Sequence, residues 1–481
     1  MIDYPIRFFN TNIPTNKCNL RCHYCYVGQT YSFNNEHLEM NLEYSFDHMK
    51  KSLSLSRLGG VCMFNLCASG ETMLYKQLPE IVQMFLELGH YVSIVTNLTL
   101  SKPLKQILEI AEKYKDKLFI KCSFQYMELQ KLNLIEKFFE NVELLKNNGI
   151  SFTVELTAND ESIRYIDDIK QLCMLKLGAL THIIESRNEG EEHYRRLTQL
   201  PIDVHKRVWG GFDSPLFAYQ QSKWDRKIET FCYAGEYRLS INMADGSVTQ
   251  CDGGVHLENM FEHPDKKYYF SAIGCNCFYK HCYASHYQSC LCNNFGDDNA
   301  PTYAEERDRV CADGSHWLTP VMREVFSHRM SEWHEPYSED KKLFIDVLMR
   351  YQYMQEFPTE EEAKKLVDIL EQRFNGKPVG LVQAPEWLVS LFIEAGLKLK
   401  FIIDDCGDNP PLGAKQKLKA RFRYIYRKIR RDKVVRMKLF DIFPDTEIII
   451  CDYINYPRLS RIITERNSKL KITNVVDVIM K

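Results

Sequence analysis

Near the N-terminus runs Lys17-Cys18-Asn19-Leu20-Arg21-Cys22-His23-Tyr24-Cys25-Tyr26, which places three cysteines on one short loop with the spacing C-x3-C-x2-C. Three thiolates on one loop can ligate three irons of a [4Fe-4S] cluster, whereas ferredoxin-type sites supply four cysteines per cluster. The fourth iron would then stay open to bind another molecule. A zinc loop is the alternative, because C-x2-C pairs also occur in many zinc sites.

Apolar runs of strand length follow this loop, and two of them end in polar residues. The first run, Val61–Leu66, leads into Ser69-Gly70-Glu71. The second, Tyr91–Val95, ends in Thr96-Asn97. A glycine at a strand end lets a second backbone or a ligand approach closely. We therefore expect a binding site where these two strands end.

Further strands are predicted at 119–123, 151–157 and 179–184, with helical patterning between them. One of these helices closes at Asn148-Gly149, a typical C-cap. Alternating strands and helices predict an α/β fold with a parallel sheet. The expected architecture is a partial (β/α)6 TIM-type barrel that binds ligands at the carboxyl ends of its strands.

The cysteine loop and the strand ends together resemble the radical S-adenosylmethionine (radical SAM) family. Ser69-Gly70-Glu71 is similar to the Gly-Gly-Glu signature of that family, with Ser replacing the first Gly. Thr96-Asn97 is similar to the family's Thr-Asn-Gly-Thr segment. Leu98 replaces the Gly of that segment, so we expect a different turn. An aromatic residue before the third cysteine, here Tyr24, also fits the family.

This resemblance implies a [4Fe-4S] cluster on Cys18, Cys22 and Cys25, with the amino and carboxylate groups of SAM on its open iron. The residues implied to contact SAM lie on the loop and at the strand ends: Tyr24, Ser69, Gly70, Glu71, Thr96, Asn97 and Ser123. An external one-electron reductant, such as flavodoxin or ferredoxin, is also implied. The catalytic acid or base stays open, because Glu155, Asp160 and Glu185 near strand ends are equally compatible with salt bridges.

A second group of cysteines begins at Cys232. The stretch from Cys232 through Gly246 to Cys251 resembles the opening half of a SPASM domain, the auxiliary-cluster extension of one radical SAM branch. The later spacing, C-x1-C-x4-C-x7-C-x1-C, departs from that pattern. One or two auxiliary iron-sulfur clusters are expected, and a zinc knuckle is the alternative. The candidate ligands are Cys232, Cys251, Cys275, Cys277, Cys282, Cys290 and Cys292.

The remaining cysteines lie mostly in apolar segments and are predicted to be small core residues. These are Cys62, Cys67, Cys122, Cys173, Cys406 and Cys451, while Cys311 stays open as a late cluster ligand.

The sequence predicts four parts: the barrel over 1–225, a SPASM-like auxiliary cluster domain over 226–312, a helical connector over 313–375, and a small Rossmann-like α/β domain over 376–481. The last part lacks glycines after its first strand, which argues against dinucleotide binding and favours a docking or substrate-presenting role. It contains a basic segment, 415–438, predicted as an amphipathic helix. That helix is compatible with peripheral membrane contact or with a solvated surface.

Composition sets the outer limits of these expectations. A chain of 481 residues is long enough for two to four domains. A net charge of -2 gives no general attraction to nucleic acid, so no nucleic acid partner is expected. Seventeen cysteines without an export signal favour metal binding in the cytoplasm over a disulfide framework.

The resulting hypothesis is a radical SAM enzyme of the oxidoreductase type, which splits SAM to a 5′-deoxyadenosyl radical that takes hydrogen from an organic substrate. Only seventeen residues precede the cysteine loop, which disfavours a peptide-binding wing, and the Rossmann-like part favours a small-molecule or carbohydrate substrate, such as a sugar or surface-polysaccharide precursor. Two alternatives stay open. One is a SPASM-type maturase that modifies peptide or protein side chains, and the other is a non-catalytic iron-sulfur binding protein.

Overall fold

A computed structural model of the chain describes residues 2–30, 38–188, 195–252, 254–275, 277, 279–282, 284–374, 378–403, 435–436, 447–452, 456–466, 471–474 and 476. The chain divides into two compact units. The first contains Met1–Phe270 and Cys277–Glu335, and the second contains Ser271–Asn276 and Pro336–Lys481.

An eight-stranded sheet organises the first unit. Its strands are β1 (Arg7–Ile13), β2 (Cys62–Ala68), β3 (Tyr91–Thr96), β4 (Leu118–Ser123), β5 (Ser151–Thr157), β6 (His182–Ile184), β7 (Arg238–Asn242) and β8 (Val248–Thr249). The order across the sheet is β6-β5-β4-β3-β2-β1-β7-β8. All neighbours pair in parallel except β7 and β8, which are antiparallel. The predicted α/β fold is confirmed, and the sequential order of β1 to β6 is consistent with a partial TIM barrel.

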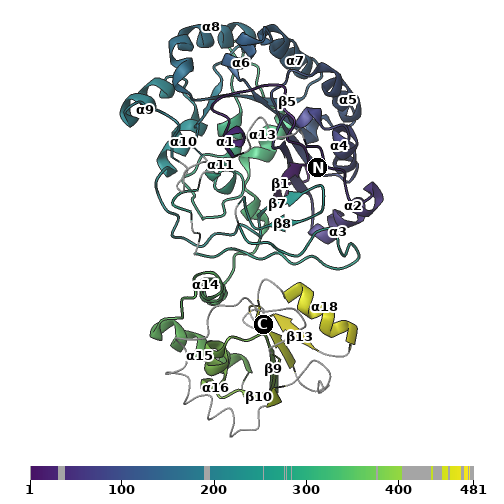
Figure 1. Cartoon of the computed structure of the whole chain (residues 1–481), viewed down its shortest axis with the longest axis vertical. Coiled ribbons are helices and arrows are strands. Elements are labelled where there is room, and N and C mark those ends of the chain that lie inside the picture. The colour runs from purple at the N-terminus through teal and green to yellow at the C-terminus, as the bar shows by residue number, and fades with distance from the viewer. Residues whose placement is uncertain are drawn as a thin grey trace. The chain divides into compact units, whose positions relative to one another are not determined.

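Helices connect the parallel strands, and α4, α5, α7 and α8 lie along the outer side of the sheet (Figure 1). The helices of this unit are α1 (Tyr26–Thr30), α2 (Phe46–Ser52), α3 (Leu55–Leu58), α4 (Leu78–Glu87), α5 (Ser101–Ala111), α6 (Tyr126–Lys131), α7 (Ile135–Asn147), α8 (Ile166–Leu177), α9 (Ile202–Gly210), α10 (Pro215–Lys223), α11 (Ser285–Gln288), α12 (Tyr303–Arg307) and α13 (Pro320–Ser327). Short 3-10 turns stand at Thr72–Leu74, Lys115–Lys117, Asp160–Tyr165 and Met330–Trp333.

The core lies between the sheet and these helices. Phe64 of β2 is fully buried and stacks on Phe9 of β1 and on Phe85 of α4, with ring centroids 4.8 and 4.0 Å apart. Strands covered on both faces read as continuous apolar runs, which is why β2 and β3 were predictable from sequence. Strands β1 and β7 were not predicted, because polar residues such as Asn10 and Ser240 interrupt their apolar pattern.

The predicted boundary at residue 313 falls inside the first unit. Thr319 bonds Ser151 of β5 through their hydroxyls at 3.1 Å, and Ala312 donates its backbone N–H to Gly178 at the end of α8. These contacts join residues that follow the cysteine-rich segment to the barrel.

A five-stranded parallel sheet organises the second unit, in the order β11-β10-β9-β12-β13. Its strands are β9 (Pro378–Val382), β10 (Lys398–Ile403), β11 (Val435–Arg436), β12 (Glu447–Ile450) and β13 (Ile472–Asn474), and its helices are α14 (Glu339–Met354), α15 (Glu360–Phe374), α16 (Glu386–Glu394) and α18 (Tyr456–Arg466). Numbered from β9, this order is 3-2-1-4-5, as in doubly wound nucleotide-binding folds.

The predicted basic helix over 415–438 is wrong at one place. Val435–Arg436 is strand β11, which pairs in parallel with Phe401 and Ile402 of β10. Backbone pairing with a sheet edge excludes a helix at these two residues. The remainder of 415–438 lies outside the described residues.

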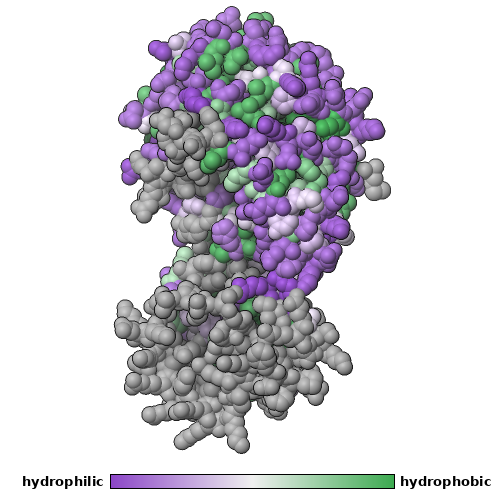
Figure 2. Space-filling view, turned by 45° about the vertical axis from the view of Figure 1, so that its right-hand side comes forward, coloured by the Kyte–Doolittle hydropathy of each residue, from purple (hydrophilic) through white to green (hydrophobic). Residues whose placement is uncertain are grey.

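The helices of the described residues were compared with the requirements of a membrane span. No helix among the described residues combines the length and the apolar character needed to cross a bilayer. On the face shown in Figure 2, hydrophilic residues predominate and apolar residues are dispersed among them.

Phe64→Ala should lower the free energy of unfolding of the first unit by about 3–5 kcal/mol, because the truncation leaves a cavity between two stacked rings. Chemical denaturation followed by near-ultraviolet circular dichroism measures this effect. Leu175→Ala is the control, since Leu175 is 77% exposed and should shift the midpoint little. Equal shifts for the two variants would contradict the assigned core.

Candidate active site

A cavity of about 310 Å³ opens where the parallel strands β2 to β6 end. The three cysteines of the N-terminal loop, Cys18, Cys22 and Cys25, all line it. The same cavity is lined by the predicted SAM contacts except Ser69: Tyr24, Gly70, Glu71, Thr96, Asn97 and Ser123. The structure therefore brings together residues that are separated by up to about a hundred positions in the sequence.

Close backbone contact holds the cysteine loop against the end of β2. The N–H of Glu71 donates to the carbonyl of Lys17, at 2.7 Å. A Cβ atom on Gly70 would lie 2.1 Å from that same carbonyl oxygen. Only glycine allows the loop to dock at this distance. Gly70 thus allows Lys17, and with it the next residue Cys18, to lie close against the end of β2.

A chain of side-chain hydrogen bonds ties the loop to the end of β3. Asn97 donates through Nδ2 to Oδ1 of Asn19, at 2.8 Å, and Asn19 donates in turn to the hydroxyl of Thr99, also at 2.8 Å. The Thr99 hydroxyl donates back to Oδ1 of Asn97, at 2.7 Å. Because Asn19 follows Cys18, this closed set of bonds fixes the orientation of the loop.

Glu71 joins the ends of β2 and β3 through its carboxylate. It accepts hydrogen bonds from the Thr96 hydroxyl at 2.6 Å, the Asn97 backbone N–H at 2.7 Å and the Met73 backbone N–H at 3.0 Å. Burial raises the pKa of Glu71, while these three donors lower it. The carboxylate therefore positions the two strand ends, in addition to lining the cavity.

The turn after β3 keeps a conformation that glycine adopts without strain. Leu98 has φ 55°, in the left-handed region, and is fully buried. The buried leucine side chain and the N–H that Leu98 donates to the Thr96 hydroxyl, at 2.9 Å, stabilise this left-handed backbone.

The three loop thiols fit a cluster by the chemistry of the donor set. Burial raises the pKa of Cys18 to about 11, and burial and then the neighbouring Cys25 and Cys18 thiols raise the pKa of Cys22. Bound iron would keep such thiols ionised, since a metal takes thiolate ligands. Within the part of the chain that the structure describes, no group of three or more His, Cys, Asp or Glu side chains is arranged to hold a single metal ion.

Comparison with known families agrees with this geometry. Residues 12–173 match the model of the Radical SAM superfamily. The chain carries a radical SAM domain. The match spans the cysteine loop and strands β2 to β5, and it ends within α8.

The chain is also similar, over part of its length, to several solved structures. Streptococcus suis SuiB bound to S-adenosylmethionine is 17% identical, with a TM-score of 0.38 over 54% of this chain and 64% of SuiB, so the similarity spans less than two thirds of that protein. The anSMEcpe protein with bound AdoMet is 19% identical, with a TM-score of 0.41 over 54% of this chain and 77% of that one. BtrN in complex with AdoMet and 2-DOIA is 13% identical, with a TM-score of 0.30 over 55% of this chain and 80% of BtrN. A search of curated proteins found no match.

Beyond the radical SAM domain, four of the seven candidate auxiliary cysteines act on one another. The thiols of Cys282, Cys277 and Cys251 all contribute, after burial, to the raised pKa of Cys232, which places these four thiols within electrostatic range. Cys277 and Cys251 likewise contribute to the raised pKa of Cys282. These four are the candidate ligands that the fold brings together in the first unit.

The other three candidates have different surroundings. Cys275 belongs to the second unit, where its backbone N–H donates to Asp346 at 2.8 Å. Cys290 is fully buried, and after burial the Glu306 carboxyl beside it raises its pKa. Cys292 is fully buried with its sulfur 3.7 Å from that of Met330.

Three acids near strand ends bind neighbouring side chains. Glu155 forms an ion pair with Arg307, and Glu185 lies 3.1 Å from His205. Asp160 accepts a hydrogen bond from the Thr198 hydroxyl, at 2.7 Å. Glu155 and Glu185 therefore form salt bridges, which is one of the two roles that the sequence left open for them.

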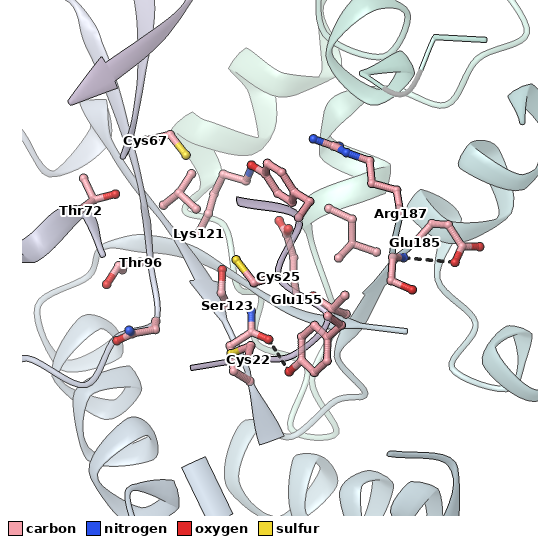
Figure 3. Close-up of a pocket in the computed structure, with 18 of the residues that line it drawn as sticks. Cys22, Cys25, Cys67, Thr72, Thr96, Lys121, Ser123, Glu155, Glu185 and Arg187 are labelled. Atoms are coloured by element: carbon pink, nitrogen blue, oxygen red, sulfur yellow. Dashed lines mark hydrogen bonds between the residues drawn. The ribbon is translucent and has the colours of Figure 1, made fainter. Parts of the chain in front are cut away.

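Several cavity residues were missed from the sequence, among them Asn10, Cys67, Lys121, Arg187, Arg238, Asp252, His286 and Tyr287. Cys67 was assigned to the core, but it lines the cavity because it precedes the end of β2. In Figure 3, Lys121 and Arg187 lie above Cys22 and Cys25, and Thr72 and Thr96 lie to their left. The sequence held one signal for these cavity residues, namely a charged residue inside an apolar strand, as Lys121 is in β4.

Gly70→Ala should displace the cysteine loop, because the added Cβ would overlap the Lys17 carbonyl. We expect the reconstituted variant to bind SAM at least about tenfold more weakly, a free-energy loss of about 1.4 kcal/mol. Equilibrium dialysis with labelled SAM measures this change. The control is Gly210→Ala in α9, where an added Cβ meets nothing within 4 Å. Unchanged SAM affinity in Gly70→Ala would contradict the assigned contact.

Replacing Cys251 and Cys282 together by alanine should remove about four irons per chain if the four-cysteine group holds one auxiliary [4Fe-4S] cluster. Iron and sulfide analysis after anaerobic reconstitution measures this loss. Cys275→Ala is the matched control and should keep its full iron content. Equal iron losses in both variants, or none in either, would rule out this assignment.

Proposed function

We propose that this protein cleaves SAM reductively and uses the resulting radical to take a hydrogen atom from an organic substrate. One observation carries the proposal: the cysteine loop and the ends of β2, β3 and β4 line a single cavity, which also has charged residues on its walls. A cavity that combines both sets of residues can hold SAM and a substrate together. Preorganised positioning of this kind is what enzymes use to direct a reactive group to one bond.

The residues of the chain have separate tasks in this mechanism. Cys18, Cys22 and Cys25 would hold a [4Fe-4S] cluster, which with SAM supplies a 5′-deoxyadenosyl radical when both are bound and an electron is delivered. Glu71 and Asn97 hold the strand ends and the loop in fixed relative positions through the bonds described above. Tyr24 is buried and donates its hydroxyl to Gln125 at 2.6 Å, so its ring is held in one orientation at the cavity wall.

Apolar wall residues would keep water away from the reacting atoms. Leu20 from the loop, Val95 from β3 and Ile184 from β6 contribute carbon surface to the cavity. Exclusion of water protects a reactive intermediate from side reactions. Such shielding is suited to radical chemistry on an unactivated carbon.

We propose a small-molecule substrate, such as a sugar or a surface-polysaccharide precursor. Support comes from the cavity, whose lining includes Ala284, His286 and Tyr287 of the cysteine-rich segment. The parallel sheet of the second unit, with its nucleotide-fold strand order, also favours a small metabolite. Peptide or protein side-chain modification is the alternative that the substrate assay below tests directly.

An auxiliary cluster on Cys232, Cys251, Cys277 and Cys282 is part of the proposal. Such a cluster would take the substrate electron after hydrogen removal, which makes the net reaction an oxidation. Flavodoxin or ferredoxin is the proposed external electron donor. Asp252 follows Cys251 and lines the cavity, so the chain itself connects the four-cysteine group to the substrate side.

Anaerobically reconstituted protein, reduced with dithionite, should form 5′-deoxyadenosine from SAM. A Cys18/Cys22/Cys25 triple alanine variant should form none, because the open iron is lost. Chromatography of the products measures this, and deuterated sugars and peptides then identify which class transfers deuterium to 5′-deoxyadenosine. A fully loaded, reducible wild-type protein that never cleaves SAM would overturn the proposal in favour of a non-catalytic iron-sulfur protein.

A further inference from the structure

The acids on the cavity wall already have partners. Glu71 accepts three hydrogen bonds, Glu155 pairs with Arg307, and Glu185 contacts His205 and Arg196. Asp252 pairs with Arg238 at 2.5 Å, and it accepts further bonds from Asn10 at 2.9 Å and Ser240 at 2.7 Å. Each of these carboxylates therefore already has hydrogen-bond or ion-pair partners within the protein.

Buried polar nitrogen atoms on the same wall have no hydrogen-bond partner among the described residues. Arg238 is 1% exposed, and while its Nη2 contacts Asp252, its Nε and Nη1 have no hydrogen-bond partner among the residues that the structure describes. His286 is 7% exposed, and its Nδ1 also has no partner. Unpaired buried polar groups of this kind cost stability, so a retained set indicates an acceptor supplied from outside the chain.

Lys121 adds a full positive charge at this place. It is 5% exposed, it hydrogen-bonds the Tyr287 hydroxyl, and among the described residues no carboxylate lies within salt-bridge distance of it. An ammonium group with two unused N–H donors thus faces the cavity.

The three groups come from different elements and meet beside the SAM-contact residues. Lys121 is on β4, Arg238 begins β7, and His286 is on α11. Lys121 stands two residues before Ser123, so both side chains point to the same face of the strand, about 7 Å apart. Figure 3 shows Lys121 and Ser123 on the same side of Cys25.

We propose that Lys121, Arg238 and His286 form an anion subsite that binds a carboxylate or phosphate group of the substrate. This inference deepens the proposed function, on which it rests, by naming the substrate class: an anionic metabolite. The anion would supply acceptors to the unpaired N–H groups of Arg238 and to the ammonium of Lys121, and charge-assisted bonds of this type are the strong ones. Its neighbouring carbons would lie on the Ser123 side, toward SAM.

The proposed subsite lies beside the place of SAM, since Lys121 stands two residues before Ser123 on β4. In the family that the chain matches, the carboxylate of SAM is expected on the open iron, at the cysteine loop. Lys121 and Arg238 belong to β4 and β7 instead. The decisive test therefore measures anion binding while SAM is already bound.

The experiment uses the reconstituted full-length protein, oxidised and saturated with SAM, so that no turnover occurs. Inorganic phosphate and acetate are titrated separately by calorimetry, with neutral glucose as the uncharged probe. We expect at least one anion to bind, and we expect Lys121→Met to weaken that binding about tenfold or more through loss of a charged hydrogen bond. Lys105→Met, at an exposed position of α5, is the control and should leave it unchanged.

The outcomes separate the alternatives. Phosphate binding alone identifies a phosphorylated substrate, and acetate binding alone identifies a carboxylated one. No anion binding to the wild type, equal affinity in Lys121→Met, or displacement of the anion by SAM would each overturn the subsite. If Lys121→Met fails to fold, as judged by lost SAM affinity, Lys121→Gln takes its place, since an amide can still reach Tyr287.

Failure of the subsite and failure of the proposed function give different results. Loss of anion binding leaves the formation of 5′-deoxyadenosine untouched. Absence of SAM cleavage, in turn, leaves the anion titration of the oxidised protein unchanged.

Discussion

The contact between the Lys17 carbonyl and Gly70 is the constraint on which the active site depends. It sets the distance between the cysteine loop and the end of β2, and it leaves no room for a side chain at residue 70. The Glu71 carboxylate accepts a hydrogen bond from the backbone of Asn97 at the end of β3, and the Asn97 side chain donates in turn to Asn19 of the loop. A short loop of irregular backbone is thereby tied to the ends of two buried strands.

The second organising feature is the imbalance of hydrogen-bonding groups on the cavity wall. The wall carboxylates are paired within the protein, whereas Nε and Nη1 of Arg238 and Nδ1 of His286 have no hydrogen-bond partner among the described residues. Buried polar groups are normally satisfied. We have proposed that the same cavity binds SAM at its strand ends and an anionic group of the substrate beside it, which would favour an anionic substrate over a neutral sugar.

Much of the barrel was predictable because its strands are buried on both faces and its polar signatures stand at strand ends. Strands β2 to β6 and the clustering of Cys18, Cys22 and Cys25 with Gly70, Thr96 and Asn97 followed from these patterns. Strand β1 was not predictable, because the polar residues Asn10 and Thr11 interrupt its apolar run. Asn10 lines the cavity, and the Thr11 hydroxyl donates a hydrogen bond to the Phe9 carbonyl. The division of the seven later cysteines also depends on tertiary placement: Cys275 folds with the second unit, and spacing alone cannot show this.

Electron paramagnetic resonance of the reduced protein tests the central claim most directly, with Cys251 and Cys282 replaced by alanine so that a single cluster remains. If Cys18, Cys22 and Cys25 hold a [4Fe-4S] cluster with an open iron, addition of SAM will shift the g values of the reduced cluster. A well-formed [4Fe-4S] signal that SAM leaves unchanged would contradict the account.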